Sequence, residues 1–219
     1  MINKWIRIIG FFLSAGCLTC LFLLSCCGKT EVSSNVFNQW MQSSDKIKVL
    51  STVAMIDDIV RQIGKEKILH MPLISGQIDP HSYEIVKGDD EKIKMAIVVF
   101  YNGLGLEHGA SLSNHLLNHK NAIALGDIVA HKVPQEMIYI DRTLDPHIWM
   151  DISLWSLIID PIVQELSRLD PDSAEFYKNN GKNLLEAMQR MDKKIYHAIH
   201  EIPSSQRYLV TSHDAFNYF

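Results

Sequence analysis

The chain has 219 residues, of which 47% are hydrophobic, enough to build the core of one large domain or two small ones. Its formal net charge is −4, and no basic run is present that could neutralise the phosphates of a nucleic acid. Composition and charge therefore predict a globular protein and argue against nucleic acid as a partner.

Residues 1–25 have the layout of a signal peptide. Lys4 and Arg7 precede a long apolar stretch, and the segment contains no acidic residue. Leu23-Leu24-Ser25 stands directly before Cys26, as in a bacterial lipoprotein signal. We therefore expect an exported protein in which Cys26 is lipidated and anchors the chain to a membrane.

Two alternatives remain open for this segment. The apolar stretch 8–24 could be an uncleaved membrane anchor, although its length is at the short edge of what spans a bilayer. Cys17 is a weaker candidate for lipidation. The four cysteines all lie in or beside this segment, at positions 17, 20, 26 and 27. A metal site in the exported body would therefore use nitrogen and oxygen ligands.

After a polar stretch at 26–45, which we interpret as a tether, strand-like and helix-like segments alternate through residue 150. Strands are expected at 46–50, 67–74, 96–101 and 122–125, and helices after Thr52, after Asp89, at 106–117 and from Asp127. Thr52 and Asp89 are expected helix caps. This alternation predicts an α/β fold with a parallel sheet covered on both faces, and we assign 46–150 to a first lobe.

A helical segment is expected at 151–202. One amphipathic helix runs through Leu169, and Pro161 should kink it or start it anew. A second helix runs from Pro171 to about Ile199 and, at 1.5 Å per residue, is about 40 Å long. Such a helix is long enough to link two lobes.

The remaining residues, 203–219, are predicted to begin a second lobe. Tyr208–Thr211 is expected to form a strand, and a helix is expected to start at Ala215-Phe216. A parallel strand needs neighbours, so we expect the chain to be truncated within this lobe.

Three histidines occur in similar settings, 66 residues apart (147 − 81 and 213 − 147). Asp79-Pro80-His81 recurs as Asp145-Pro146-His147, and His213 follows the expected strand at 208–211. Proline restricts the backbone around each of the first two histidines. Imidazole is the commonest metal ligand, and ligands of parallel α/β sheets bind beyond the carboxyl ends of the strands. We predict that the three imidazoles converge on one divalent metal ion.

Other histidines compete for this role: His70, His108, His115, His119 and His131. His115 and His119 are four residues apart and could chelate a metal on a helix face. No His-Glu-x-x-His pattern accompanies them, so a solvated face is the favoured interpretation. His197 and His200 are expected to be exposed on the polar side of the long helix.

Four ordered motifs carry a resemblance to a known family. They are Asp79–Glu84, Tyr101–Glu107, Asp145–Trp149 and Thr211–Phe216. In this order and spacing they closely resemble the metal-binding receptors of bacterial ABC importers, the solute-binding lipoproteins that take up zinc, manganese or iron. The resemblance covers about residues 46–219.

The resemblance implies a two-lobe receptor in which one long helix joins two small α/β lobes and the metal lies between them. His81 and His147 would be ligands from the first lobe, and His213 the first ligand from the second. Family members add an acidic ligand far downstream, so we expect this chain alone to bind metal weakly or not at all. The implied partners are an ABC permease and its ATPase, and the receptor would be a monomer in the periplasm.

The identity of the metal stays open at this stage. A third histidine, where some members have glutamate, favours zinc or iron over strict manganese selectivity. A long His-rich loop after Glu107, seen in dedicated zinc receptors, is absent from the sequence. Asp151 and Asp214 could orient an imidazole or cap helices, and capping is favoured.

Two alternatives to a transport receptor remain open. A zinc-dependent hydrolase would also use three protein ligands and an open position for water, but no motif supplies a general base. A non-functional fragment of a receptor is the other alternative. We therefore expect a binding protein and not an enzyme.

Overall fold

The computed structural model describes residues 38–42, 45–76 and 78–219. The predicted signal segment, Cys26 and most of the predicted tether lie outside this part of the chain. Residues 38–42, within the predicted tether, are helical, and residues 44–219 form one compact unit. Among the described residues, no helix combines the length and apolar character needed to cross a membrane.

A four-stranded parallel sheet forms the centre of the compact unit, in the order β2-β1-β3-β4. The strands are β1 (Ile47–Val53), β2 (Ile68–Ile74), β3 (Val98–Tyr101) and β4 (Ala122–Ala124). Val49 of β1 pairs with His70 on one side and Val98 on the other. β2 is an edge strand, which tolerates Pro72 because one side of it needs no backbone donor. The predicted parallel sheet is confirmed.

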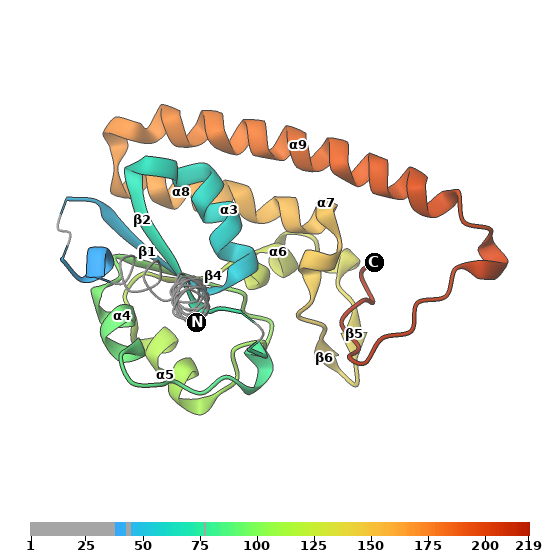
Figure 1. Ribbon diagram of the computed structural model, residues 1–219, viewed down its shortest axis with the longest axis horizontal. Helices are drawn as coiled ribbons and strands as arrows, with labels where there is room; N and C mark the ends of the chain where they lie inside the picture. Colours follow the sequence, from blue (N-terminus) through green and yellow to red (C-terminus); the bar gives the residue numbers. More distant parts are fainter. Residues whose placement is uncertain (1–37, 43–44, 77) are drawn as a thin grey trace, which may run out of the picture. The chain divides into compact units, whose positions relative to one another are not determined.

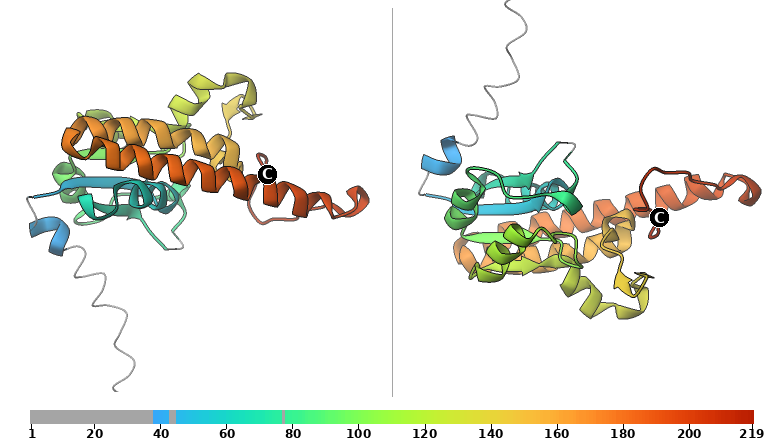
Figure 2. Two further views of the ribbon diagram at one scale, coloured as in Figure 1. Left: turned by 90° about the horizontal axis from the view of Figure 1, so that it is seen from above. Right: turned by 90° about the horizontal axis from the view of Figure 1, so that it is seen from below.

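Helices cover both faces of this sheet (Figures 1 and 2). They include α3 (Ala54–Gly64), α4 (Asp89–Met95), α5 (Ala110–Asn118) and α6 (Leu125–Lys132). Ile56, Val60 and Ile63 of α3 are fully buried and lie on one helix face. The chain crosses from β1 to β2 in one direction and from β2 to β3 in the other, so the sheet has a topological switch point beside β1. Ligands of such sheets bind at this point, beyond the carboxyl ends of the strands.

Residues 151–202 are largely helical, as predicted. They include α7 (Ile152–Trp155), α8 (Ile159–Leu169) and α9 (Ala174–His200). Pro161 lies in the first turn of α8, so it starts a new helix there. The 27 residues of α9 confirm the predicted long helix, which extends over about 40 Å.

Close packing holds α9 against the rest of the unit (Figure 1). Gly181 lets α9 approach α8, because a Cβ at this position would lie 2.6 Å from a methyl carbon of Val163. The side-chain amide of Asn180 donates to the carbonyl of Ile63 at 3.0 Å, which ties α9 to the end of α3. The first half of α9 is therefore part of the core.

The predicted strand at Tyr208–Thr211 is not formed. Tyr208, Leu209 and Val210 are 83%, 59% and 93% exposed, and no described strand lies beside them for their backbone to pair with. Ala215-Phe216 likewise begins no described helix. The segment instead folds back toward a short hairpin that was not predicted, β5 (Tyr139–Ile140) and β6 (Thr143–Leu144) (Figure 1).

Two of the predicted helix caps, Thr52 and Asp89, are wrong. Thr52 lies inside β1, and α3 begins at Ala54 without a side-chain cap. Asp89 is the first residue of α4, and its buried carboxylate accepts a hydrogen bond from the Tyr83 hydroxyl. Short polar residues near helix starts resemble caps in sequence, but here the Thr52 hydroxyl bonds to the distant Glu107 and the Asp89 carboxylate to groups within six residues of it.

Candidate metal centre

The structure brings the three predicted histidines together. The Nε2 atom of His147 lies 3.1 Å from Nε2 of His81 and 3.2 Å from Nε2 of His213. One ring nitrogen from each residue lies within 4.8 Å of the others. A tetrahedral ion with metal–nitrogen bonds near 2.0–2.1 Å holds its nitrogens about 3.4 Å apart. The spacing of these nitrogens is close to the spacing that such an ion requires.

His147 is held on two sides by Asp145. One carboxylate oxygen, Oδ1, accepts the backbone N–H of His147 at 3.0 Å and the ring Nδ1–H at 2.6 Å. Both side chains are buried. Burial by itself raises the pKa of Asp145, but hydrogen bonds from the His147 backbone, Asn217 and the imidazole outweigh it and lower this pKa. With Nδ1 as the donor, Nε2 of His147 presents its lone pair to the other two rings.

His81 lies in a short 3-10 helix, Pro80–Ser82, that follows β2. Asp79 accepts the backbone N–H of His81 at 2.9 Å and the Ser82 hydroxyl at 3.2 Å, which fixes the turn. Burial, and then the neighbouring His147 ring, lower the pKa of His81. A lowered pKa favours the neutral imidazole that a metal ion binds.

A buried carboxylate, that of Glu107, holds the turn that contacts the His147 loop. Glu107 accepts hydrogen bonds from the Thr52 hydroxyl at 2.6 Å and from the N–H groups of Asn102 and Gly103 at 2.8 and 3.0 Å. Gly103 has a positive φ of 73°, which lets the chain turn back toward this carboxylate. Burial raises the pKa of Glu107, and the hydrogen bonds offset part of that rise.

Asn102 transmits this support to the metal centre. Its side-chain amide donates to the carbonyl of Pro146 at 3.1 Å, directly before His147. The motif Tyr101–Glu107 therefore joins the ends of β1 and β3 to the His147 loop. This role was not predicted from the sequence, although an acidic residue after a buried strand and a glycine-rich turn is a usable signal for it.

His213 differs from the other two because its segment has neither strand nor helix. Its ring is exposed, yet it lies 5.1 Å from the His147 ring and 5.3 Å from the His81 ring, centre to centre. The irregular segment therefore reaches the centre without the support of a sheet.

The family model described as "Zinc-uptake complex component A periplasmic" matches residues 49–219. The chain belongs to this family. It is 35% identical over 218 residues to the metal-binding protein YtgA of Chlamydia muridarum, covering all of this chain and 64% of that protein. It is 31% identical over 210 residues to the manganese-binding lipoprotein MntA of Bacillus subtilis, covering 94% of this chain and 65% of that lipoprotein.

The same likeness is seen in three dimensions. The crystal structure of Fe(III)-bound YtgA from Chlamydia trachomatis superposes with a TM-score of 0.76 at 38% identity, covering 79% of this chain and 61% of that one. The predicted metal-receptor fold, with its parallel sheet and long helix, is thus confirmed. The chain spans less than two thirds of the length of these relatives.

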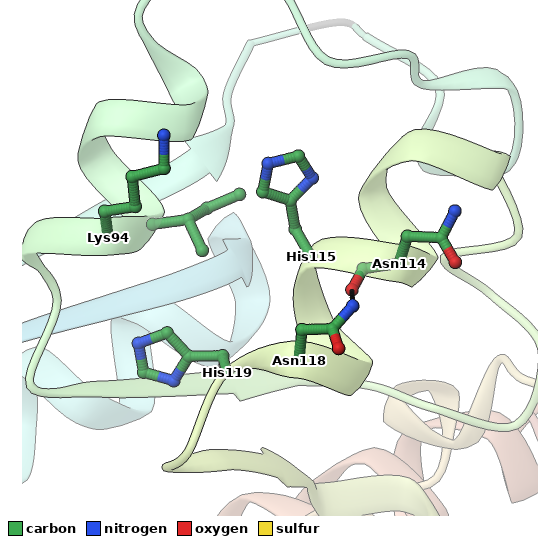
Figure 3. Close-up of a pocket in the computed structure, with 6 residues that line it drawn as sticks. Lys94, Asn114, His115, Asn118 and His119 are labelled. Carbon is green, nitrogen blue, oxygen red and sulfur yellow. Dashed lines mark hydrogen bonds between the residues drawn. The ribbon is translucent and has the colours of Figure 1, made fainter.

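Among the competing histidines, His108 lies beside the site, with its ring 6.0 Å from the His81 ring and its Nδ1 3.0 Å from the Gly105 carbonyl. Three others are engaged away from the site. His119 donates through Nε2 to the Ala96 carbonyl and accepts the Asn121 N–H at Nδ1, so neither nitrogen is available for a metal. His115 donates to the Ser111 carbonyl. Figure 3 shows both rings lining a pocket beside Lys94, Asn114 and Asn118. His70 pairs with Asp57, and His197 and His200 are exposed as predicted.

The two aspartates expected to cap helices, Asp151 and Asp214, have different outcomes. Asp151 caps α7, since its carboxylate accepts the Leu154 N–H at 3.0 Å and the Ser153 hydroxyl at 2.6 Å. Asp214 caps no helix within the described residues, which form turns after it. The carboxylate that orients an imidazole is Asp145, a role that the sequence analysis did not assign.

Proposed function

We propose that the chain is the extracytoplasmic solute-binding component of an ABC transporter and captures a divalent transition metal ion for import. The observation that carries the proposal is that the Nε2 atoms of His81 and His213 lie 3.1 and 3.2 Å from Nε2 of His147, with one nitrogen of each ring within 4.8 Å of the others. The metal is the cargo, and the role is binding and not catalysis. Family membership supports this role.

The cargo that we propose is zinc, manganese or iron. Three imidazole nitrogens suit zinc or iron better than manganese, which prefers carboxylate and water oxygens. The relatives are named for binding manganese, for binding a metal and, in the solved YtgA structure, for Fe(III). The fourth coordination position would be taken by water or by a group outside these three residues.

The proposed partners are an ABC permease and its ATPase, to which a monomeric receptor hands the metal at the outer face of the membrane. Lipidation of Cys26 would anchor the receptor there. The lipoprotein name of the Bacillus relative supports this placement. Cys26→Ser should release the protein from the membrane fraction, and retention of the variant there would contradict the anchor.

Zinc titration of the purified chain against a chromophoric chelator tests the binding role. Because the structure brings the three imidazoles together without a fourth ligand, we expect weak but saturable binding of one ion, lost in the double variant His81→Ala, His147→Ala. The matched control is His197→Ala, which removes an exposed imidazole from α9 and should bind as the wild type does. Unchanged zinc binding in the double variant would contradict the proposal.

A further inference from the structure

Residues 201–219 reach the metal centre with little support of their own. Apart from a 3-10 turn at Ser204–Gln206, this stretch has no helix or strand. Tyr208, Leu209 and Val210 are largely exposed, yet His213 lies with Nε2 3.2 Å from Nε2 of His147. Holding an irregular segment in one place costs about 1–2 kcal/mol of backbone entropy per residue, so specific contacts must oppose that cost.

Two side chains just after His213 provide such contacts, and both meet Asp145. The side-chain amide of Asn217 donates to Oδ2 of Asp145 at 3.0 Å. The hydroxyl of Tyr218 donates to the backbone carbonyl of Asp145 at 3.2 Å and accepts the N–H of Ile138 at 3.0 Å. Tyr218 is only 9% exposed, so its ring is buried as well.

The two oxygens of the Asp145 carboxylate thereby accept hydrogen bonds from two different segments, each of which carries one of the histidines. Oδ1 serves the backbone and ring of His147, while Oδ2 serves Asn217, four residues after His213. Every polar contact of Asn217 and Tyr218 described here falls on Asp145 or on the start of its hairpin. Docking of the segment and orientation of His147 therefore depend on the same residue.

We propose that Asn217 and Tyr218 form a latch that holds His213 beside His147, so that the three-imidazole site is assembled before the metal arrives. The inference rests on the proposed function. Both are positioning residues, because they act through Asp145 and the backbone and do not face the metal. With the latch formed, the conformational entropy of the His213 segment is lost during folding. That loss therefore does not weaken metal binding.

Two conservative variants test the latch. Tyr218→Phe removes the bridging hydroxyl and keeps the ring, and Asn217→Ala removes the amide. Each should raise the zinc dissociation constant about threefold to tenfold, the loss expected for one or two hydrogen bonds. The matched controls are Tyr208→Phe and Asn179→Ala, which make the same changes at exposed positions and should bind as the wild type does.

A double-variant cycle separates positioning of His213 from general weakening of the fold. In a His213→Ala background the segment has no ligand to deliver, so Tyr218→Phe should weaken zinc binding no further. The visible absorption of bound Co²⁺ should likewise change on Tyr218→Phe only when His213 is present. Equal weakening in both backgrounds would overturn the proposal.

Hydrogen exchange of the metal-free protein provides a readout that does not depend on binding. Tyr218→Phe should speed exchange of the Ile138 amide and of residues 211–219, whereas His213→Ala should leave both unchanged. Unchanged exchange in Tyr218→Phe would overturn the latch while leaving the proposed function intact. A wild type that shows the exchange pattern but binds no zinc would overturn the proposed function, and with it the role of the latch in metal binding.

Discussion

Two loops of this chain carry the same Asp-Pro-His tripeptide but hold their histidines differently. Asp79 is exposed and accepts the backbone N–H of His81 and the Ser82 hydroxyl. Asp145 is 1% exposed and accepts both the backbone N–H and the ring of His147. The local sequence fixes the same backbone contact in both loops, and the surroundings decide whether the carboxylate also orients the ring.

Burial and neighbours account for the difference. The loop of His147 is tied to the body by Asn102 and contacted by Asn217 and Tyr218. Asp145 is thereby shielded from solvent, and its carboxylate accepts from the imidazole. The loop of His81 has no such cover over Asp79. One histidine is therefore preorganised for a metal, and the other keeps more freedom.

The largest effect should come from removing the preorganised ligand. His147→Ala should weaken zinc binding at least about 100-fold, more than the loss typical of a group that only orients a ligand. His213→Ala should cost about tenfold, because an exposed ring on an irregular segment contributes less. Competition titrations against a zinc chelator measure both. Equal losses would show that the two histidines are equally well placed.

The next effect distinguishes the two aspartates. Asp145→Ala should weaken zinc binding about 10–100-fold, because it releases the His147 ring. It should also lower the free energy of unfolding by about 2–3 kcal/mol, since buried donors lose their acceptor. Asp79→Ala, the matched change in the exposed loop, should have smaller effects on both. Thermal unfolding with zinc titration tests the pair, and a larger loss in Asp79→Ala would reverse the comparison.

A smaller effect on stability is expected from changing Glu107, which holds the turn that contacts the His147 loop. Glu107→Gln replaces one acceptor oxygen by a donor that faces the Thr52 hydroxyl or backbone N–H groups, so the free energy of unfolding should fall by about 1–2 kcal/mol. Denaturant unfolding measures this change. Glu186→Gln, at an exposed position on α9, is the control and should be neutral.

The same residue gives the smallest predicted effect, a pH dependence. Burial raises the pKa of Glu107 above its ordinary value, so the folded state holds this proton more tightly than the unfolded state. The stabilisation of the fold by this proton on Glu107 is thus fully present below the pKa of the unfolded state. It is lost as the pH rises through the pKa of the folded state. Wild type should show this decline relative to Glu107→Gln, and parallel stability curves would argue against it.

Much of the first half of the fold could be predicted from the sequence. The strands at 68–74 and 98–101 are buried apolar runs, and such runs form parallel strands wherever helices cover them. The long helix was predictable because its apolar spacing persists over many turns. The caps predicted at Thr52 and Asp89 are absent, although Asp151 does cap α7. Thr52 instead donates to Glu107, 55 residues away.

The metal centre shows the same limit. Proline and aspartate beside His81 and His147 indicated constrained, ligand-like positions, and the structure brings both rings together with His213. The strand predicted before His213 is absent, because strand-forming side chains give no strand without a neighbour. The roles of Glu107 and Tyr218 depend on contacts between distant segments that no local pattern contains.

The sequence by itself therefore determined the family, the parallel sheet, the long helix and which three histidines to examine, because periodicity and local motifs act over a few residues. Only the tertiary structure decided that Asp145 orients His147, that Glu107 supports its loop and that Asn217 and Tyr218 dock the segment of His213. Burial removes water from these groups and leaves each one to bond with whatever distant partner the fold brings near. That choice is made by packing and not by spacing along the chain.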